Sequence, residues 1–397
     1  MKKVLSFSLF LLVGLVASQL LPDFMGESFT AIKSYALTPL LYICLAFIMI
    51  NVGREFEVDK AHWRSYTQDY FIAMATAALP WLLVALYYVF VLLPPHLWGS
   101  GAIWRETLLL SRFAAPTSAG ILFAMLATLN LKSSWIYKKI QVLAIFDDLD
   151  TIILMIPLQI MMIGMQWQLF VVVFIVVVLL ALGWRKLDCY NVRQDWKAIL
   201  FYAVVVFGIT HALYHVSESL IPGEHNGIHI EVLLPAFVVG MIIKHNPVHS
   251  LSEERVENSI SYLFMLLVGL SMPLVVGAHA HSHPETESVI SLAVPTMHWH
   301  VIALHVLSVT LLSNIGKLMP LFFYRDRRLS ERLAVSVGMF TRGEVGAGVI
   351  FIAISYGLGG TALIVSALTL VLNLVLTGVF VVWVKVLAQR SYLKKDA

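Results

Sequence analysis

The chain alternates between long, uninterrupted apolar runs and short polar connectors. A hydrocarbon core about 30 Å thick takes about 20 apolar residues per helix, and twelve runs approach this length. They cover residues 4–21, 35–52, 71–93, 107–129, 140–162, 167–184, 198–216, 230–244, 259–277, 300–323, 333–357 and 361–386. Because the runs are continuous and do not alternate with polar residues, a membrane β-barrel is disfavoured. The pattern predicts an all-α polytopic membrane protein with about 12 transmembrane helices.

Composition narrows the class of protein. Of the 397 residues, 59% are hydrophobic and 13% are charged, against about 45–50% and about 25% in soluble domains. These values exclude a water-soluble enzyme, a secreted scaffold and a disordered regulator. The net charge of +3 is too small for a nucleic-acid-binding surface. Cys44 and Cys189 provide neither a disulfide framework nor a metal quartet, so we expect a lipid-embedded protein without a cofactor or structural metal.

The polar connectors predict how the chain is oriented in the membrane. Lys and Arg gather in short cytoplasmic loops, and 22 of the 27 basic residues fall on the side of the amino terminus when connectors are assigned alternately to the two faces. Two fall on the opposite side and three lie inside predicted spans. Both termini are therefore expected in the cytoplasm. The first 19 residues also resemble a signal peptide, whose cleavage would leave eleven spans in the same orientation.

Ionisable residues inside membrane spans are costly and by default mark ion pathways. Here they are Arg112, Asp147, Asp148, Asp150, Lys317, Arg342 and Glu344. At 1.5 Å per residue, Asp147 lies roughly 13 Å and Lys317 roughly 12 Å from the cytoplasmic ends of their spans. Two opposite charges at one depth predict an ion pair between the two helices.

Neighbouring carboxylates in a low dielectric resist double ionisation and titrate as a coupled unit. A pair such as Asp147 and Asp148 can therefore exchange a proton for a small cation, and carboxylate oxygens suit Na⁺ or Li⁺. The alternative is that these acids only neutralise Lys317 and Arg342 as structural pairs. That alternative stays open most clearly for Asp150.

Two spans contain helix-breaking residues. Pro116 precedes Thr117 and Ser118 in the middle of span 4, and four glycines flank the charged residues of span 11. Breaks inside hydrocarbon survive only where they are buried or line a cavity, and matched breaks in two halves point to a secondary-transporter site. The Thr117 and Ser118 hydroxyls are candidate neutral ligands for a cation. Close helix packing at glycine is the alternative explanation.

Several segments resemble the monovalent cation/proton antiporters, in particular the sodium/proton antiporters of the NhaA and NapA type. LAIFDDLDTIIL in span 5 is similar to their paired-aspartate helix, GKLMP in span 10 to their lysine helix, and GMFTRGEVG in span 11 to their broken-helix signature. The resemblance extends over essentially the whole chain. It implies an inverted-repeat antiporter fold in which spans 4 and 11 are discontinuous.

The resemblance also implies roles for individual residues. Asp148 would bind the cation and the proton directly, and Asp147 would pair with Lys317 and share in proton coupling. Thr117 would lie where the broken spans cross. Two acids and a lysine resemble the electrogenic branch of the family.

The resemblance also bears on the charged residues of span 11 and on a third acid in span 5. Arg342 and Glu344 would neutralise one another and the exposed ends of the half-helices. Asp150 departs from the pattern, because NhaA-like sequences carry a small residue there. It adds a possible third acid.

The implied division of the chain has five parts. Residues 1–70 and 198–299 would form a dimerisation and scaffold domain, residues 166–197 a linker helix, and residues 71–165 and 300–397 a six-helix transport core. The core would move against a scaffold that forms a homodimer, in the inner membrane of a bacterium.

The leading hypothesis is a proton antiporter for Na⁺ or Li⁺, which is a transporter and not an enzyme. Alternatives are a K⁺/H⁺ exchanger and an ion-coupled carrier of an organic solute on the same fold. An intramembrane aspartyl protease is disfavoured, because Asp147 and Asp148 are neighbours on one helix. The loop containing His279, His281 and His283 is more simply a solvated connector than a metal site.

Overall fold

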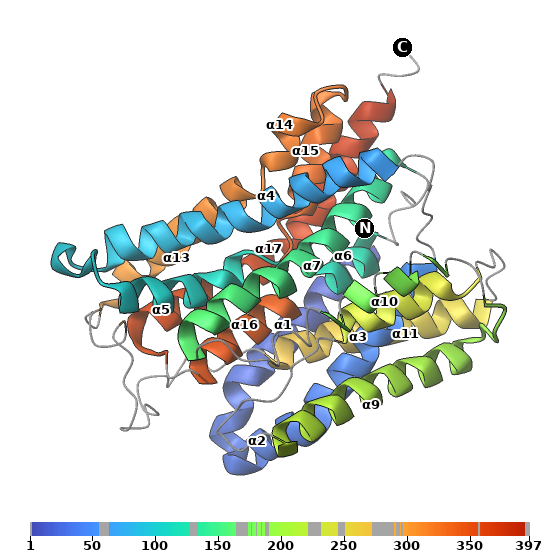
Figure 1. Ribbon diagram of the computed structural model, residues 1–397, viewed down its shortest axis with the longest axis horizontal. Helices are drawn as coiled ribbons and strands as arrows, with labels where there is room; N and C mark the ends of the chain where they lie inside the picture. The colour runs from blue at the N-terminus through green and yellow to red at the C-terminus, as the bar shows by residue number, and fades with distance from the viewer. Residues whose placement is uncertain are drawn as a thin grey trace. The chain divides into compact units, whose positions relative to one another are not determined.

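The structure is a computed structural model that is helical over most of its described length (Figure 1). The described residues are 2–54, 63–126, 134–163, 174–175, 177–179, 181–183, 185–186, 190–220, 232–244, 251–271, 290, 294, 297–355 and 358–393. A named helix overlaps each of the other eleven predicted spans, and within span 167–184 the described residues, 174–175, 177–179 and 181–183, are helical.

The chain divides into two compact units, of which the first comprises residues 1–24, 62–162 and 268–397. Its helical elements are α1 (Lys2–Met25), α4 (Trp63–Tyr87), η3 (Tyr88–Leu92), η4 (Pro95–Leu97), α5 (Gly101–Ser111), η5 (Arg112–Ala114), α6 (Ala119–Leu126), α7 (Trp135–Ile163), α13 (Trp299–Gly316), α14 (Met319–Phe323), α15 (Leu329–Gly338), α16 (Glu344–Ser355) and α17 (Gly360–Leu393). This unit contains all the charged residues that the sequence places inside spans.

The second unit comprises residues 25–61 and 163–267. Its helical elements are α2 (Glu27–Ile32), η1 (Lys33–Leu37), α3 (Thr38–Arg54), α9 (Trp196–Leu220), α10 (Leu233–Ile242) and most of α11 (Leu251–Ser271). Helix α3 packs against both α9 and α10. The assignment of transport and scaffold roles to parts of the chain stays a prediction.

Five helices of the described chain are long and apolar enough to cross a membrane. They are Tyr35–Arg54, Tyr66–Leu92, Trp196–Leu213, Trp299–Phe323 and Gly360–Ser391. Together with the apolar composition, these helices identify an integral membrane protein. The total number of spans and the orientation of the termini stay predictions.

Helix α13 packs between α4 and α17, and α4 and α13 run side by side in Figure 1. At the contact, a Cβ atom on Gly316 would lie 2.6 Å from the backbone nitrogen of Pro80, closer than real Cβ contacts come. The approach of the two backbones therefore requires glycine at position 316. This contact holds the end of α13, and the lysine that follows it, in the interior of the unit.

The span predicted as continuous over 300–323 is interrupted. Helix α13 ends at Gly316 and α14 begins at Met319. Pro320 explains the interruption, because its ring clashes with the carbonyl of the residue four positions earlier, Gly316, and it lacks an N–H to donate. The interruption places Lys317 directly after the last residue of α13.

Two further interruptions coincide with the residues that predicted them. Helix α5 ends at Ser111, η5 follows, and residues 115–118 are not helical before α6 begins at Ala119. In the other half, α15 ends at Gly338 and α16 begins at Glu344. That these interruptions make spans 4 and 11 discontinuous membrane helices stays a prediction.

Candidate ion-binding site

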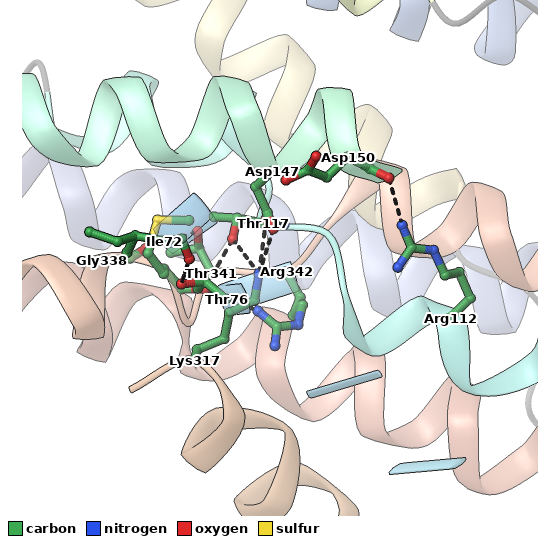
Figure 2. A network of polar contacts seen from close by, with 11 residues as sticks. Ile72, Thr76, Arg112, Thr117, Asp147, Asp150, Lys317, Gly338, Thr341 and Arg342 are labelled. Carbon is green, nitrogen blue, oxygen red and sulfur yellow. Dashed lines mark hydrogen bonds and ion pairs between the residues drawn. The ribbon is translucent and has the colours of Figure 1, made fainter. Parts of the chain in front are cut away.

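Four elements of the first unit meet around one buried carboxylate (Figure 2). Asp147 lies in the middle of α7 and Thr117 in the non-helical segment before α6. Lys317 follows α13, and Arg342 lies in the segment between α15 and α16. The interruptions matter here, because they expose backbone groups that a regular helix would consume.

Asp147 and Lys317 form a fully buried ion pair. The Lys317 Nζ atom lies 2.9 Å from Asp147 Oδ2 and 3.1 Å from Oδ1, and both side chains are 0% exposed. The depth estimate placed the two charges at one level, and the structure brings them into contact. A buried charge without such a partner is strongly destabilising, so each residue stabilises the other in the interior.

Thr117 connects the pair to the interrupted segment. Its backbone N–H donates to Asp147 Oδ2 at 2.6 Å, and its hydroxyl oxygen accepts a hydrogen bond from Lys317 Nζ at 3.0 Å. The same hydroxyl donates to the Met339 carbonyl at 3.2 Å. Asp147 therefore receives hydrogen bonds on both carboxylate oxygens, from a side chain and from a backbone amide that only a broken helix leaves free.

The two interrupted segments contact each other directly. The Ser118 N–H donates to the Thr341 carbonyl at 3.1 Å across the two segments. Within the second segment, Arg342 Nη1 donates to the Met339 carbonyl at 3.1 Å. These bonds satisfy backbone groups that would otherwise be unpaired in an apolar interior. Ser118 thus lies where the two segments meet, next to Thr117, which contacts both members of the ion pair.

Arg342 brings a second buried cation to the site. It is 1% exposed, and within the described residues its Nε and Nη2 atoms have no hydrogen-bond partner. The Glu344 side chain lies outside the described residues, so the predicted neutralisation of Arg342 by Glu344 stays a prediction. Asp147 is an acidic group whose charge acts on Arg342.

Asp150 lies one helical turn after Asp147 on α7 and is 1% exposed. The Arg112 side chain contacts the backbone of Asp150, because Arg112 Nη2 donates to the Asp150 carbonyl at 3.1 Å (Figure 2). The Tyr70 hydroxyl interacts with the Asp150 carboxylate. Asp150 Oδ2 has no hydrogen-bond partner among the described residues. Arg112 also stacks on Trp81, with its Cζ atom 4.8 Å from the ring centroid.

The Asp148 side chain lies outside the described residues, although its backbone is part of α7. Its predicted role as the direct cation and proton ligand therefore stays a prediction. His279, His281 and His283 also lie outside the described residues.

Sequence reasoning missed a second polar cluster, which joins α4, α7 and the segment after α14. Asp69 is 1% exposed and accepts hydrogen bonds from Lys139 Nζ and, at 2.7 Å, from the Tyr324 hydroxyl. Burial, together with the negative charge of Asp69, raises the pKa of Tyr324, which keeps its hydroxyl protonated and able to donate. Asp69 precedes the apolar run predicted from residue 71, and no signal in the sequence distinguished it from a surface acid.

The site has the donor set for a small hard cation. Carboxylate, hydroxyl and freed backbone carbonyl oxygens lie together, and these are the ligands that alkali cations take. Within the described residues, no group of three or more His, Cys, Asp or Glu side chains is placed to hold a metal ion. Chemically, the arrangement can hold a proton or a cation near Asp147 and can balance its charge with Lys317.

Comparison with known proteins gives likenesses in structure and none in sequence. No protein-family model matches the chain, and no curated protein matches it in sequence. The structure is similar to that of the sodium proton antiporter MjNhaP1 from Methanocaldococcus jannaschii at pH 8, with a TM-score of 0.57 and 16% sequence identity. The likeness covers 94% of this chain and 92% of that one. The chain therefore has the fold of a known antiporter over almost its whole length.

Proposed function

We propose that the protein is a secondary active antiporter that exchanges protons for a monovalent cation, Na⁺ or Li⁺. The cation and protons compete for Asp148 and Asp147, and the site is exposed alternately to the two faces of the membrane. The antiporter fold supports the class of activity. The observation that carries the proposal is the buried Asp147–Lys317 pair at the meeting point of two interrupted segments.

The pair offers a physical route to coupling. Lys317 neutralises Asp147 when no cation is bound, and an arriving cation supplies the same positive charge. Two cations beside one carboxylate repel each other, so cation binding favours loss of a proton from the site. Thr117 contributes a backbone N–H to Asp147 and a hydroxyl oxygen to Lys317, so it contacts both members of the pair from the non-helical segment.

The number of charges supports an electrogenic exchange, in which more than one proton moves per cation. Asp147, Asp148 and Lys317 are the groups we assign to this coupling. Asp150 is a third acid in the same helix, and we propose that it modifies the proton count. Arg342 and Glu344 balance charge at the break between α15 and α16.

We also propose that the protein works as a homodimer in the inner membrane of a bacterium, with both termini in the cytoplasm. The basic connectors support this orientation.

The proposal is tested in proteoliposomes with an imposed proton gradient. Na⁺, Li⁺ and K⁺ are added in turn to wild type, to Asp148→Asn and to Asp147→Asn, and collapse of the gradient is followed with a pH-sensitive dye. Wild type should respond to Na⁺ and Li⁺, and both variants should lose the response. A response to K⁺ alone would identify a K⁺/H⁺ exchanger.

Asp195→Asn is the matched control, because Asp195 forms an exposed ion pair with Arg193 outside the predicted spans. It should exchange cations as wild type does. A proton flux that ignores all three cations, or that survives in both site variants, would contradict the proposal and favour a carrier of an organic solute.

A further inference from the structure

The same five-residue pattern occurs on two neighbouring helices near Lys317. TLLSN covers residues 310–314 of α13, and TLVLN covers residues 369–373 of α17. The two patterns meet, because Asn314 Nδ2 donates to Asn373 Oδ1 at 3.0 Å. Asn373 Nδ2 then donates to the Thr369 carbonyl at 3.0 Å. Each threonine precedes its asparagine by one helical turn, and in the predicted topology both helices run in the same direction.

Three oxygen atoms of this cluster are buried and unsatisfied. Within the described residues, Thr310 Oγ1, Asn314 Oδ1 and Thr369 Oγ1 have no hydrogen-bond partner. Thr369 is 0% exposed, and Thr310 and Asn314 are 6% and 9% exposed. Buried polar atoms are nearly always paired with protein or with ordered water, and an orphan carries its full desolvation cost. Asn314 and Asn373 meet between α13 and α17, and helix periodicity puts Thr310 and Thr369 on the same faces one turn earlier. Three orphaned oxygens on these facing sides therefore indicate a ligand.

Thr377 shows that this arrangement is not imposed by the helix. Its hydroxyl, two turns after Thr369 on α17, donates to the Asn373 carbonyl at 2.9 Å in the usual way for a membrane helix. Thr369 and Thr310 make no such bond. Their hydroxyl groups are therefore available for an external partner.

The chemistry of the three atoms identifies the ligand as water. An amide oxygen needs a donor, while a hydroxyl group needs an acceptor for its hydrogen, and a water molecule supplies both. A cation would satisfy the oxygen lone pairs and leave the hydroxyl hydrogens unpaired. The buried ammonium of Lys317, three residues after Asn314, also repels a cation.

We propose that Thr310, Asn314 and Thr369 form a binding site for buried water that serves proton transfer to and from the Lys317 site. The inference rests on the proposed antiport function. The water site begins one turn from Lys317, whose backbone N–H donates to the Asn314 carbonyl at 3.1 Å. Water is both a donor and an acceptor, so it can pass a proton through a buried helix interface.

The first test is the sign of a stability change. Thr310→Val and Thr369→Val remove a hydroxyl at nearly constant volume. Hydroxyls that hold water lose a hydrogen bond on substitution, so both variants should unfold at a lower temperature than wild type in detergent. Truly orphaned hydroxyls would make the same variants more stable, which would overturn the proposal. Thr377→Val is the matched control for the loss of a satisfied hydroxyl on α17.

The second test is transport. Thr369→Val should lower the rate of cation-driven proton flux without changing the cation concentration that gives half the maximal rate. Thr377→Val should retain the wild-type rate. A destabilised Thr369→Val protein with an unchanged flux would overturn the role in proton transfer. If wild type shows no exchange, the proposed function fails, while the stability test still decides whether the site binds water.

Discussion

At the scale of single residues, the site is organised by the needs of one carboxylate. Asp147 contacts an ammonium group through both of its oxygens and receives a backbone N–H on one of them. Such an arrangement stabilises a negative charge in the interior of the unit, and it also depends on each of its partners. Removal of one partner leaves an uncompensated buried charge, whose desolvation destabilises the fold.

Lys317→Ala should therefore lower the free energy of unfolding by about 3–5 kcal/mol at neutral pH. Denaturant unfolding in detergent measures this loss.

Arg193→Ala is the control for this variant. It removes one partner of the exposed Arg193–Asp195 pair, and exposed ion pairs contribute little to stability. A Lys317→Ala protein as stable as Arg193→Ala would show that the buried pair contributes little to the fold.

The sequence predicted this pair because helix rise is constant, so that residue counts convert directly into depth. It did not predict the Thr117 backbone contact, since the direction of an amide in a non-helical segment is set by packing. The sequence also could not predict the burial of Asp69 or the Asp150 oxygen that has no partner among the described residues, because both depend on which neighbours approach from other helices.

At the scale of elements, two interrupted segments supply the polar backbone of the site. Gly343 lies where they touch, and a Cβ atom there would lie 2.8 Å from Ser118 Oγ and 2.5 Å from Ile121 Cδ1. Helix propensity does not explain this glycine; the close approach of the two segments does.

Gly343→Ala should force the Ile121 and Ser118 side chains to move, lower stability by about 1–3 kcal/mol and reduce the rate of exchange. Thermal unfolding and the dye assay measure the two effects. The comparison is Gly208→Ala on α9, where nothing lies within 4 Å of the added Cβ. Equal behaviour of the two variants would contradict the importance of the crossing.

Breaks were predictable where the sequence carried obvious signals, such as Pro116 and the glycines around Arg342. The break at Lys317 carried the same kind of signal in Pro320, but the apolar run on either side suggested one continuous span. Hydropathy indicates only whether a segment is surrounded by an apolar or an aqueous environment. It does not report whether the backbone inside that segment is regular.

At the scale of the whole molecule, the distribution of basic connectors makes a prediction about topology. In a background of Cys44→Ser and Cys189→Ser, we expect His96→Cys to react with a membrane-impermeant maleimide in intact cells. Arg193→Cys should react only after permeabilisation, because its connector is predicted to be cytoplasmic. Both positions are exposed in the structure. The reverse labelling pattern would invert the predicted orientation.

The claim common to all three scales is that protons and a monovalent cation occupy one site in turn. Its most direct test is the number of protons that the purified wild-type protein releases for each Na⁺ or Li⁺ it binds, measured by calorimetry in buffers of different ionisation enthalpy. Competition predicts release of about one proton or more per cation and tighter cation binding as pH rises. Cation binding that releases no proton and is equally tight at every pH would contradict the claim.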